Sequence, residues 1–430
     1  MRKSTTFGAV SILALWLLTA LFLYKYNLGM PSYEGHWNKR WVNAETSAHF
    51  FNTLKRYDTR PFNEHYFAIT FARACTDLVN PCVDAQIPHV PGSAQLPSPR
   101  INNEAIYTSF PPGSMIISYG VIKMTSLLSG IPISWEMLQW VDMLFWIVSI
   151  LLIYFAISII TKASKYSTAI SFLSVVPMLF ALEPMHSHQV SMWAHQAFQV
   201  FAAGAFLLLA IGINRKTVIA LGIVSALACW VEWTAYLMCI ALFFIVLIHD
   251  IKNKSGYKST IIYSSISIIG GLTLLWYYSF MVGLGPYFKE LSIRAGERGL
   301  EITYVTWKDW WMSIYYSYGP WLISAILLLT TSLTVKKSDK FDKENYTKVY
   351  ALIAIICFML IENVAMFEHA ITYTFDRLKL GFLISFIIAL SAMRMEKSGK
   401  QTLLLIAVIC VVSSVFSISE LLDIYPRYWK

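Results

Sequence analysis

The sequence predicts an all-α polytopic membrane protein. The chain has 430 residues, of which 57% are hydrophobic and only 14% charged, and its mean hydropathy is +0.55. Long uncharged apolar runs recur from one end to the other, and runs of about 20 residues can cross a bilayer as helices. A water-soluble protein of this size needs many more charged side chains on its surface. Soluble α/β enzymes, secreted disulfide scaffolds and disordered chains are therefore excluded.

The first helix is expected near the N-terminus, where an apolar run from Phe7 to about Tyr24 follows Arg2 and Lys3. This run is longer than a signal-peptide core and no A-x-A-like cleavage site follows it, so 1–24 is expected to remain as a membrane span. Ten further spans make about eleven transmembrane helices. They are expected at about 136–160, 168–184, 194–213, 217–231, 234–249, 259–282, 319–334, 349–366, 379–393 and 401–419.

The topology depends on the stretch Ser114–Gly130 within a long polar segment, 25–135. This stretch is short and contains Lys123, so it could either cross the membrane or lie in the interface. If it crossed, the Lys-rich loop Val335–Lys348 would face outside, against the positive-inside rule. The interfacial position is therefore favoured, and 25–135 is expected to be a periplasmic loop with helices at the membrane surface.

This topology leaves the N-terminus in the cytoplasm and the C-terminus outside. Seventeen of the 34 Lys and Arg residues but only five of the 25 Asp and Glu residues then lie on the inner side. The net charge of +9 is thus an orientation signal, and nucleic acid is excluded as a partner. Within the multi-helix domain 136–430, smaller periplasmic loops are expected at 183–193, 283–320 and 366–379. Polar residues gather on this outer face, which favours an enzyme at the outer surface over a transporter with charges at the midplane.

Three outer segments contain residues suited to chemistry. Apolar residues with helical spacing begin at Ala44, and Glu45 lies in the first turn of that pattern, where the helix dipole alone could favour a carboxylate. The stretch Ile101–Met115 contains Tyr-Thr-Ser-Phe-Pro-Pro-Gly, whose Pro-Pro-Gly turn ends one element and can start the next. The late segment Met366–Lys379 holds a Glu-His pair and two cations.

Together these features resemble the GT-C superfamily of polytopic glycosyltransferases, which use polyprenyl-phosphate-linked sugars. The layout is similar to that of serotype-converting O-antigen glucosyltransferases and protein O-mannosyltransferases. The chain departs from some relatives, because no Asp-Glu pair follows the first helix and no basic residue precedes the proline motif. The resemblance covers most of the chain without assigning a subfamily.

The resemblance implies that Glu45 is the general base that removes a proton from the acceptor hydroxyl, with Glu104 and Glu34 as alternatives. A polyprenyl phosphate leaves without being protonated, so one carboxylate suffices, whereas glycosidases need two. Attack from the face opposite the phosphate would invert the anomeric carbon. The remaining substrate-binding candidates are His65, Tyr107, Arg73, Arg294, Arg298, Glu368, His369, Arg377 and Lys379. The cations among them would bind the leaving phosphate or contact lipid head groups.

No metal site is assigned, although a divalent cation is left open. His186, His188 and His195 lie close in sequence, but none has the i, i+4 partner that would align two ligands on one helix, so hydrogen bonding to substrate is favoured. Glu232, at a turn between apolar runs, is expected to be paired or solvated. Among the cysteines, only two fall in the long outer loop, and a disulfide is expected between Cys75 and Cys82.

The sequence thus predicts an inverting glycosyltransferase of the bacterial inner membrane. Its partners would be a polyprenyl-phosphate sugar donor, membrane lipids and a periplasmic glycan acceptor, such as O-antigen or another part of lipopolysaccharide. One alternative is an O-antigen polymerase or ligase, because the basic stretch 289–298 would also suit a diphosphate-linked oligosaccharide. A lipid or sugar transporter is the other alternative.

Overall fold

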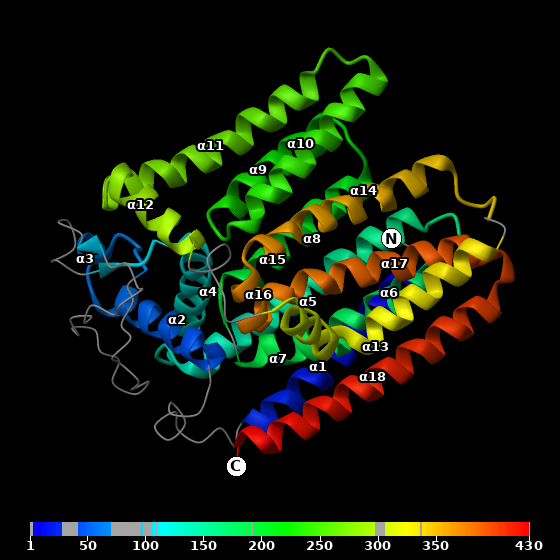
Figure 1. Cartoon of the computed structure of the whole chain (residues 1–430), viewed down its shortest axis with the longest axis horizontal. Coiled ribbons are helices and arrows are strands. Elements are labelled where there is room, and N and C mark those ends of the chain that lie inside the picture. Colours follow the sequence, from blue (N-terminus) through cyan, green and yellow to red (C-terminus); the bar gives the residue numbers. More distant parts are fainter. Residues whose placement is uncertain are drawn as a thin grey trace.

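The computed structural model describes residues 3–27, 42–69, 96–97, 105–108, 110–190, 192–296, 306–335 and 338–429. In these ranges the chain forms a bundle of long helices with shorter helices gathered at one end (Figure 1). Nine of the described helices are long and apolar enough to cross a membrane, and a tenth span results if a bent pair is counted as one. The all-α polytopic fold is confirmed.

The candidate spans follow the chain from end to end. They are α1 (Lys3–Asn27), α5 (Trp135–Ile160), the bent pair α6 (Ser167–Phe180) and α7 (Leu182–Val190), α8 (Ala194–Ile211), α10 (Thr234–Asn253), α11 (Lys258–Met281), α13 (Trp307–Thr334), α14 (Lys343–Met359) with α15 (Ile361–Ala365), η3 (Thr374–Leu378) with α17 (Lys379–Met395), and α18 (Lys400–Trp429). The other elements are α2 (Val42–Thr59), α3 (Phe62–His65), the two-residue strands β1 (Leu96–Pro97) and β2 (Ala105–Ile106), α4 (Gly113–Ser129), α9 (Arg215–Cys229), α12 (Leu284–Ala295), α16 (Phe367–Thr372) and η4 (Glu396–Ser398).

The span expected at 217–231 forms helix α9, which is shorter than the other spans. Its 15 residues extend about 22 Å, less than the roughly 30 Å of a bilayer's hydrocarbon core. It packs closely on α11, because a Cβ on Gly270 would lie only 2.4 Å from the Cα of Ala226. The described structure therefore has ten spans when the bent pair α6 and α7 counts as one, and α9 is the expected eleventh; without the bent pair it has nine.

The smaller outer segments are more helical than the sequence suggested. The loop expected at 183–193 is largely α7, which follows α6 after a 59° bend. Pro184, in the first turn of α7, has no N–H to continue the helical ladder from α6, so the chain breaks and restarts at that point. In the same way, the expected loop 366–379 contains α16 and η3.

The expected loop 283–320 contains α12 and the first half of α13. Helix α13 begins at Trp307 because Thr306 and Asp309 form a capping box, in which each side chain bonds the backbone N–H of the other residue. Pro320 lies inside this helix and does not begin it. Membrane helices tolerate proline where neighbouring groups satisfy the freed backbone.

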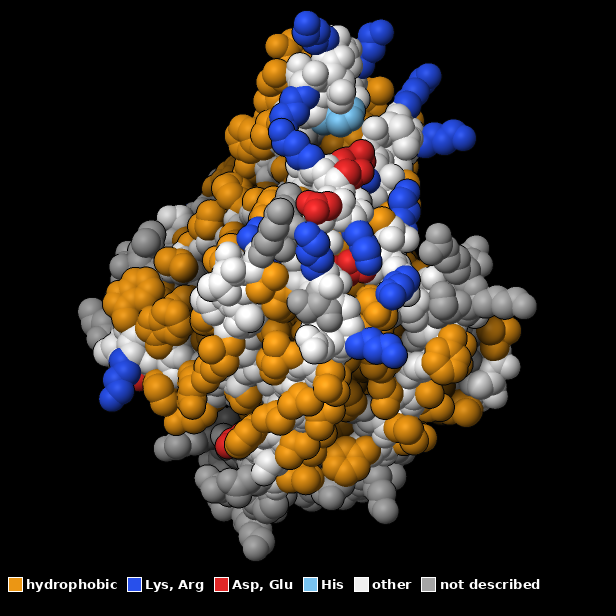
Figure 2. Space-filling view, turned by 90° about the vertical axis from the view of Figure 1, so that its right-hand side faces the viewer, with side chains coloured by type: hydrophobic (Ala, Val, Ile, Leu, Met, Phe, Trp, Pro, Cys, Tyr) orange, Lys and Arg blue, Asp and Glu red, His pale blue; other side chains and the backbone are white. Residues whose placement is uncertain are grey.

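The basic loops meet at the end of the bundle that carries the N-terminus. The Tyr154 hydroxyl, near the end of α5, donates to the carbonyl oxygen of Thr5 at 3.0 Å. The Glu396 carboxylate, at the end of α17, accepts from the Ser164 hydroxyl at 2.9 Å and from the Lys340 ammonium at 2.8 Å. Figure 2 looks onto this end and shows Lys and Arg side chains gathered over it, with hydrophobic side chains on the flanks.

We call the opposite end, where α5, α8, α10 and α17 begin, the distal end. Helices α2, α3 and α4 gather there, and α4 runs across the direction of the long helices (Figure 1). Helix α4 is tied to α2 by a salt bridge of 2.5 Å between Lys123 Nζ and Asp58 Oδ1, and by a hydrogen bond of 3.3 Å from the Tyr119 hydroxyl to the Tyr57 carbonyl. This orientation is compatible with the interfacial position expected for 114–130.

Candidate active site

A cluster of ionisable side chains is buried at the distal end. Its members come from separate elements: α7, α8, the turn after α9, α15, α16, η3 and the start of α17. Each is less than 10% exposed. They are Glu183, His195, Glu232, Glu362, His369, Asp376, Arg377 and Lys379, and we call them the distal cluster. Charged side chains are almost never fully buried unless they are paired or bind a ligand, so this concentration marks the region as the candidate site.

Glu232 lies in the turn that joins α9 to α10. One of its carboxylate oxygens, Oε2, accepts a hydrogen bond of 2.6 Å from the backbone N–H of Thr234, at the start of α10. The other oxygen, Oε1, is 3.7 Å from Nε2 of His195. Burial, and secondarily the nearby carboxylate of Glu362, raises the pKa of Glu232 above its ordinary value.

Lys379 is the first residue of α17 and forms a buried salt bridge with Glu362 of α15. The hydroxyl of Thr234 completes this group: it bonds Glu362, and its oxygen is 3.3 Å from the Lys379 ammonium. The ammonium is therefore already neutralised by a carboxylate. As a ligand for a donor phosphate, it would first have to be released or shared.

Asp376 lies between two histidines. Its Oδ1 is 2.7 Å from Nε2 of His195, and its Oδ2 contacts Nδ1 of His369. The three side chains come from η3, α8 and α16, so this chain of contacts joins the short distal helices to the bundle.

Arg377 connects α16 with α7 and α13 through its hydrogen bonds. Its Nε donates to Glu183 Oε2 at 3.1 Å and to the Ser317 hydroxyl at 3.0 Å. Its Nη1 donates to the backbone carbonyls of Ala370 and Ile371, at 2.6 and 3.1 Å. A guanidinium that meets a carboxylate and two carbonyls positions η3 and α16 against α7 and α13.

An aromatic layer covers the distal cluster. The Phe110 ring lies 6.1 Å from the ring of His195 and 5.9 Å from that of His369. Trp193 packs edge-on against Phe110 at 5.3 Å and contacts the ring of Tyr107 at 6.3 Å. These aromatic side chains shield the charges below them from water, which strengthens the electrostatic interactions among those charges.

The Pro-Pro-Gly motif fixes this layer to the turn that carries Glu232. The Gly113 N–H donates to the carbonyl oxygen of Trp230 at 2.7 Å, and a Cβ on Gly113 would lie 2.4 Å from that oxygen. Only glycine allows this close approach. The Tyr278 hydroxyl of α11 also donates to the Phe110 carbonyl at 2.6 Å.

Helix α2 reaches the aromatic layer through Phe50, whose ring is 6.3 Å from that of Trp193. His65, in α3, is buried and stacks on Tyr57 at 4.9 Å. Its Nδ1 accepts a hydrogen bond of 3.0 Å from the Phe67 N–H. Burial, followed by the charge of Arg56, lowers the pKa of His65 to about 4. A neutral histidine with these contacts orders the loop after α2.

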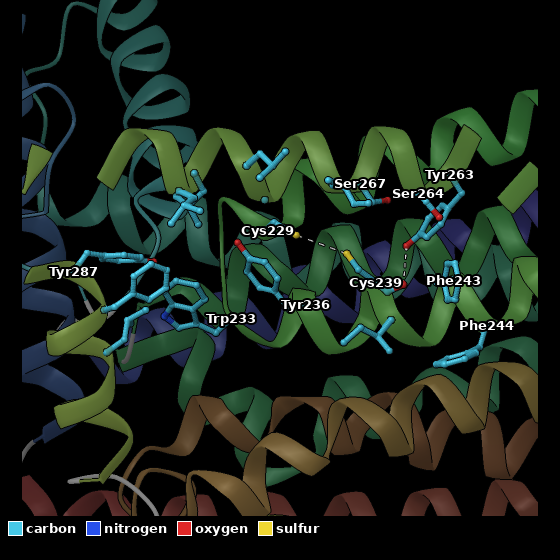
Figure 3. A pocket seen from close by; sticks show the side chains of 18 residues that line it. Cys229, Trp233, Tyr236, Cys239, Phe243, Phe244, Tyr263, Ser264, Ser267 and Tyr287 are labelled. Atoms are coloured by element: carbon cyan, nitrogen blue, oxygen red, sulfur yellow. Dashed lines mark hydrogen bonds between the residues drawn. The ribbon is translucent and has the colours of Figure 1, made fainter. Parts of the chain in front are cut away.

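An apolar cavity of about 680 Å³ lies between α10, α11 and α12 (Figure 3). Trp233 and Tyr287 line its distal end, and Phe243 and Phe244 line the other end. Its rim opens toward the membrane, since Ile240, Phe244, Ile268, Leu272 and Phe288 are each more than 40% exposed. Cys229 and Cys239 are free and also line the cavity, with their sulfur atoms 3.7 Å apart. Because Trp233 directly follows Glu232, the cavity ends beside the distal cluster.

The structure brings only part of the predicted site together. Three of the predicted residues, His369, Arg377 and Lys379, belong to the distal cluster, and Tyr107 lies in the layer above it. His65 packs separately against α2. Other predicted residues fall outside the described part: Glu34, Arg73, Glu104, Arg298 and the cysteines at 75 and 82. Glu45, Arg294 and Glu368 lie in α2, α12 and α16, but their side chains are not among those described.

The histidines of the segment 183–196 do not form one site: His188 and His195 contact different carboxylates. His188 pairs with Asp142 of α5 at 2.7 Å and stacks on Trp146 at 5.4 Å. Only His195 joins the distal cluster. The spacing of the histidines gave no sign that His195 would meet acids from distant segments.

The acids of the distal cluster were largely missed by sequence reasoning. Glu232 is fully buried beside His195 and the Thr234 N–H, so of the two expected positions the paired one holds and the solvated one does not. Glu362 lies inside an expected apolar span, 349–366, and an acid within such a span is itself a functional signal. Asp376 stands in the late outer segment that was singled out, but nothing in the local pattern distinguishes it from a surface acid.

No protein-family model and no curated protein matches the sequence. Among solved structures, the chain is similar to ArnT from Cupriavidus metallidurans in the apo state, with 9% sequence identity and a TM-score of 0.37. The match covers 91% of this chain and 79% of that chain.

Proposed function

We propose that the protein is a membrane glycosyltransferase that takes a sugar from a polyprenyl-phosphate donor and transfers it, with inversion, to a periplasmic glycan. O-antigen or another part of lipopolysaccharide is the proposed acceptor. The observation that carries the proposal is the apolar cavity between α10, α11 and α12, which ends beside the buried distal cluster. A lipid-linked substrate needs this combination of an apolar channel and an adjacent polar site.

The cavity suits a hydrocarbon chain. Its lining residues on α10 run from Trp233 to Phe244, which corresponds to about 16 Å along a helix axis. Each methylene group buried there would contribute about 0.8 kcal/mol of binding free energy. A tail held in this way would place its phosphate at the distal end, near Glu232 and below the aromatic layer.

The proposed base remains Glu45. Helix α2, which carries it, packs on the aromatic layer through Phe50, five residues further along the helix. What supports the proposal is that the helix carrying Glu45 lies at the distal end, where the base must reach the hydroxyl group that attacks the sugar. The departing phosphate needs cationic partners instead of an acid.

The test uses inside-out and right-side-out membranes that contain the wild-type protein or Glu45→Gln. Labelled polyprenyl-phosphate sugars and total lipopolysaccharide are supplied, and both label transfer and the released carrier are measured. We expect transfer by the wild type with release of polyprenyl monophosphate, and loss of transfer in Glu45→Gln. Glu64→Gln, which changes an acid of neighbouring α3, is the matched control and should remain active.

The outcomes separate the alternatives. Undiminished transfer by Glu45→Gln would retain the enzyme and reject this base. Release of a diphosphate carrier would instead identify a polymerase or ligase. Movement of a lipid-linked sugar across the membrane without covalent transfer would identify a transporter.

A further inference from the structure

Three side chains of the distal cluster have the composition of a metal site. His195, Glu232 and Glu362 each offer one ligand atom, and these atoms lie within 4.8 Å of one another. They come from three separate elements: the start of α8, the turn before α10, and α15. Donors on opposite sides of a cation with bonds of about 2.2 Å lie about 4.4 Å apart. Only one pair of donors can lie opposite each other, and donors of a tetrahedral ion lie about 3.4 Å apart, so the side chains would move inward by up to about 1 Å to complete the coordination.

When the histidines are neutral, as metal ligands must be, the charges around these residues are unbalanced. Glu232, Glu362 and Asp376 bring three carboxylates into one buried group, while Lys379 is the cation paired within it. Arg377 is committed to a different carboxylate, Glu183. A buried carboxylate without a compensating positive charge is strongly destabilising. With neutral histidines, one dication would balance the two remaining negative charges.

A second observation independently indicates a missing partner. Glu232 is fully buried, and its Oε1 has no hydrogen-bond partner among the described residues, although Oε2 is bonded to the Thr234 N–H. The unpartnered oxygen faces the imidazole of His195, at 3.7 Å from Nε2. This separation is too long for a hydrogen bond and matches two ligands on either side of a shared cation.

We propose that His195, Glu232 and Glu362 bind one divalent cation, Mn²⁺ or Zn²⁺. One imidazole and two carboxylates form a mixed set of donors that suits these ions better than the all-oxygen shells of Mg²⁺ and Ca²⁺. Asp376 contacts the same nitrogen of His195, Nε2, at 2.7 Å, so the imidazole would exchange this contact for the cation when it binds. This inference does not depend on the proposed transferase activity, since it rests on the geometry of the side chains alone.

The test measures metal uptake directly. The purified full-length protein in detergent is stripped with EDTA and then titrated with MnCl₂ or ZnCl₂ by calorimetry, and bound metal is counted by elemental mass spectrometry. We expect one ion per chain for the wild type. The affinity should fall at least tenfold in Glu232→Gln and in Glu362→Gln. Glu396→Gln, which alters a buried carboxylate at the opposite end, is the matched control and should bind like the wild type.

A measurement on the wild type covers the case in which a variant fails to fold. Mn²⁺ or Zn²⁺ that binds the folded state should raise the melting temperature with a saturable dose dependence, and Mg²⁺ should not. No uptake by the wild type, or equal uptake by a folded Glu232→Gln protein, would overturn the proposal. Because neither measurement uses donor or acceptor, a failure here is distinct from a failure of the transferase assay.

Discussion

Replacing Arg377 by leucine is expected to lower the free energy of unfolding by about 3–5 kcal/mol, the usual loss when one partner of a buried ion pair is removed. The guanidinium makes four hydrogen bonds, to Glu183, to Ser317 and to two backbone carbonyls. Leucine would leave the Glu183 carboxylate buried without its cation. The distal short helices α16 and η3 would also lose their attachment to α7 and α13.

The assay is a double-mutant cycle. Unfolding free energies are compared for the wild type, Arg377→Leu, Glu183→Leu and the double variant in detergent micelles. We expect the double variant to be more stable than the sum of the single losses predicts, with an interaction energy of about 2–3 kcal/mol. Arg215→Leu, which changes an exposed arginine at the start of α9, should alter stability by no more than about 0.5 kcal/mol.

The reasoning would be refuted if Arg377→Leu were as stable as the wild type. That result would mean that the guanidinium is held for a substrate and not for the fold. A folded double variant separates the two roles further: if it binds a lipid-phosphate donor like the wild type, Arg377 is a positioning residue, and if binding is lost, Arg377 contacts the phosphate.

Three other changes test separate parts of the structure. Gly113→Ala should destabilise the protein by more than 1 kcal/mol in chemical unfolding, because the new Cβ would lie 2.4 Å from the Trp230 carbonyl oxygen. Gly271→Leu should fill the apolar cavity and raise the KM for long-chain donors but not for short-chain ones; Gly204→Leu in α8, which has open space around it, is the control. Because the pKa of His65 falls from 6.5 in the unfolded chain to about 4 in the fold, its contribution to stability is complete above pH 6.5 and is lost as the pH falls toward 4. His65→Gln should flatten this part of the curve of unfolding free energy against pH.

Each of these expectations has a contradicting result. Wild-type stability of Gly113→Ala would mean that the Pro-Pro-Gly motif does not dock on the turn at 230–233. Equal KM changes for long and short donors in Gly271→Leu would mean that the cavity does not hold the lipid tail. An unchanged acid limb in His65→Gln would assign the pH dependence to other groups.

The fold class followed from composition, but helix boundaries did not. Apolar runs identify membrane spans because the bilayer excludes polar side chains over its whole thickness. They do not mark where a helix extends beyond the apolar run, as α13 does through its Thr306 cap. They also do not show that α6 will break and continue as α7 after Ala181, since this bend depends on one proline and its packing.

The candidate site was only partly visible in the sequence, because its residues are assembled by tertiary packing. The late outer segment supplied His369, Arg377 and Lys379, which the pattern of charges did reveal. Glu232 and Glu362 lie more than 100 residues apart along the chain, and each looks like an isolated acid near a helix end. Their proximity arises only when α10 packs on α14, and no local motif records that contact.

Two of the cations predicted to bind the donor phosphate already form salt bridges within the distal cluster. Arg377 and Lys379 are each neutralised by a buried carboxylate, so an incoming phosphate would compete with Glu183 or Glu362 for them. Helix α12 lines the apolar cavity through Leu291 and carries Arg294 three residues later. In the proposed transferase, Arg294 on α12 is therefore the predicted cation that would bind a phosphate at the distal mouth of the cavity first. The distal cluster would then hold the surrounding short helices in place and set the charge that the phosphate meets.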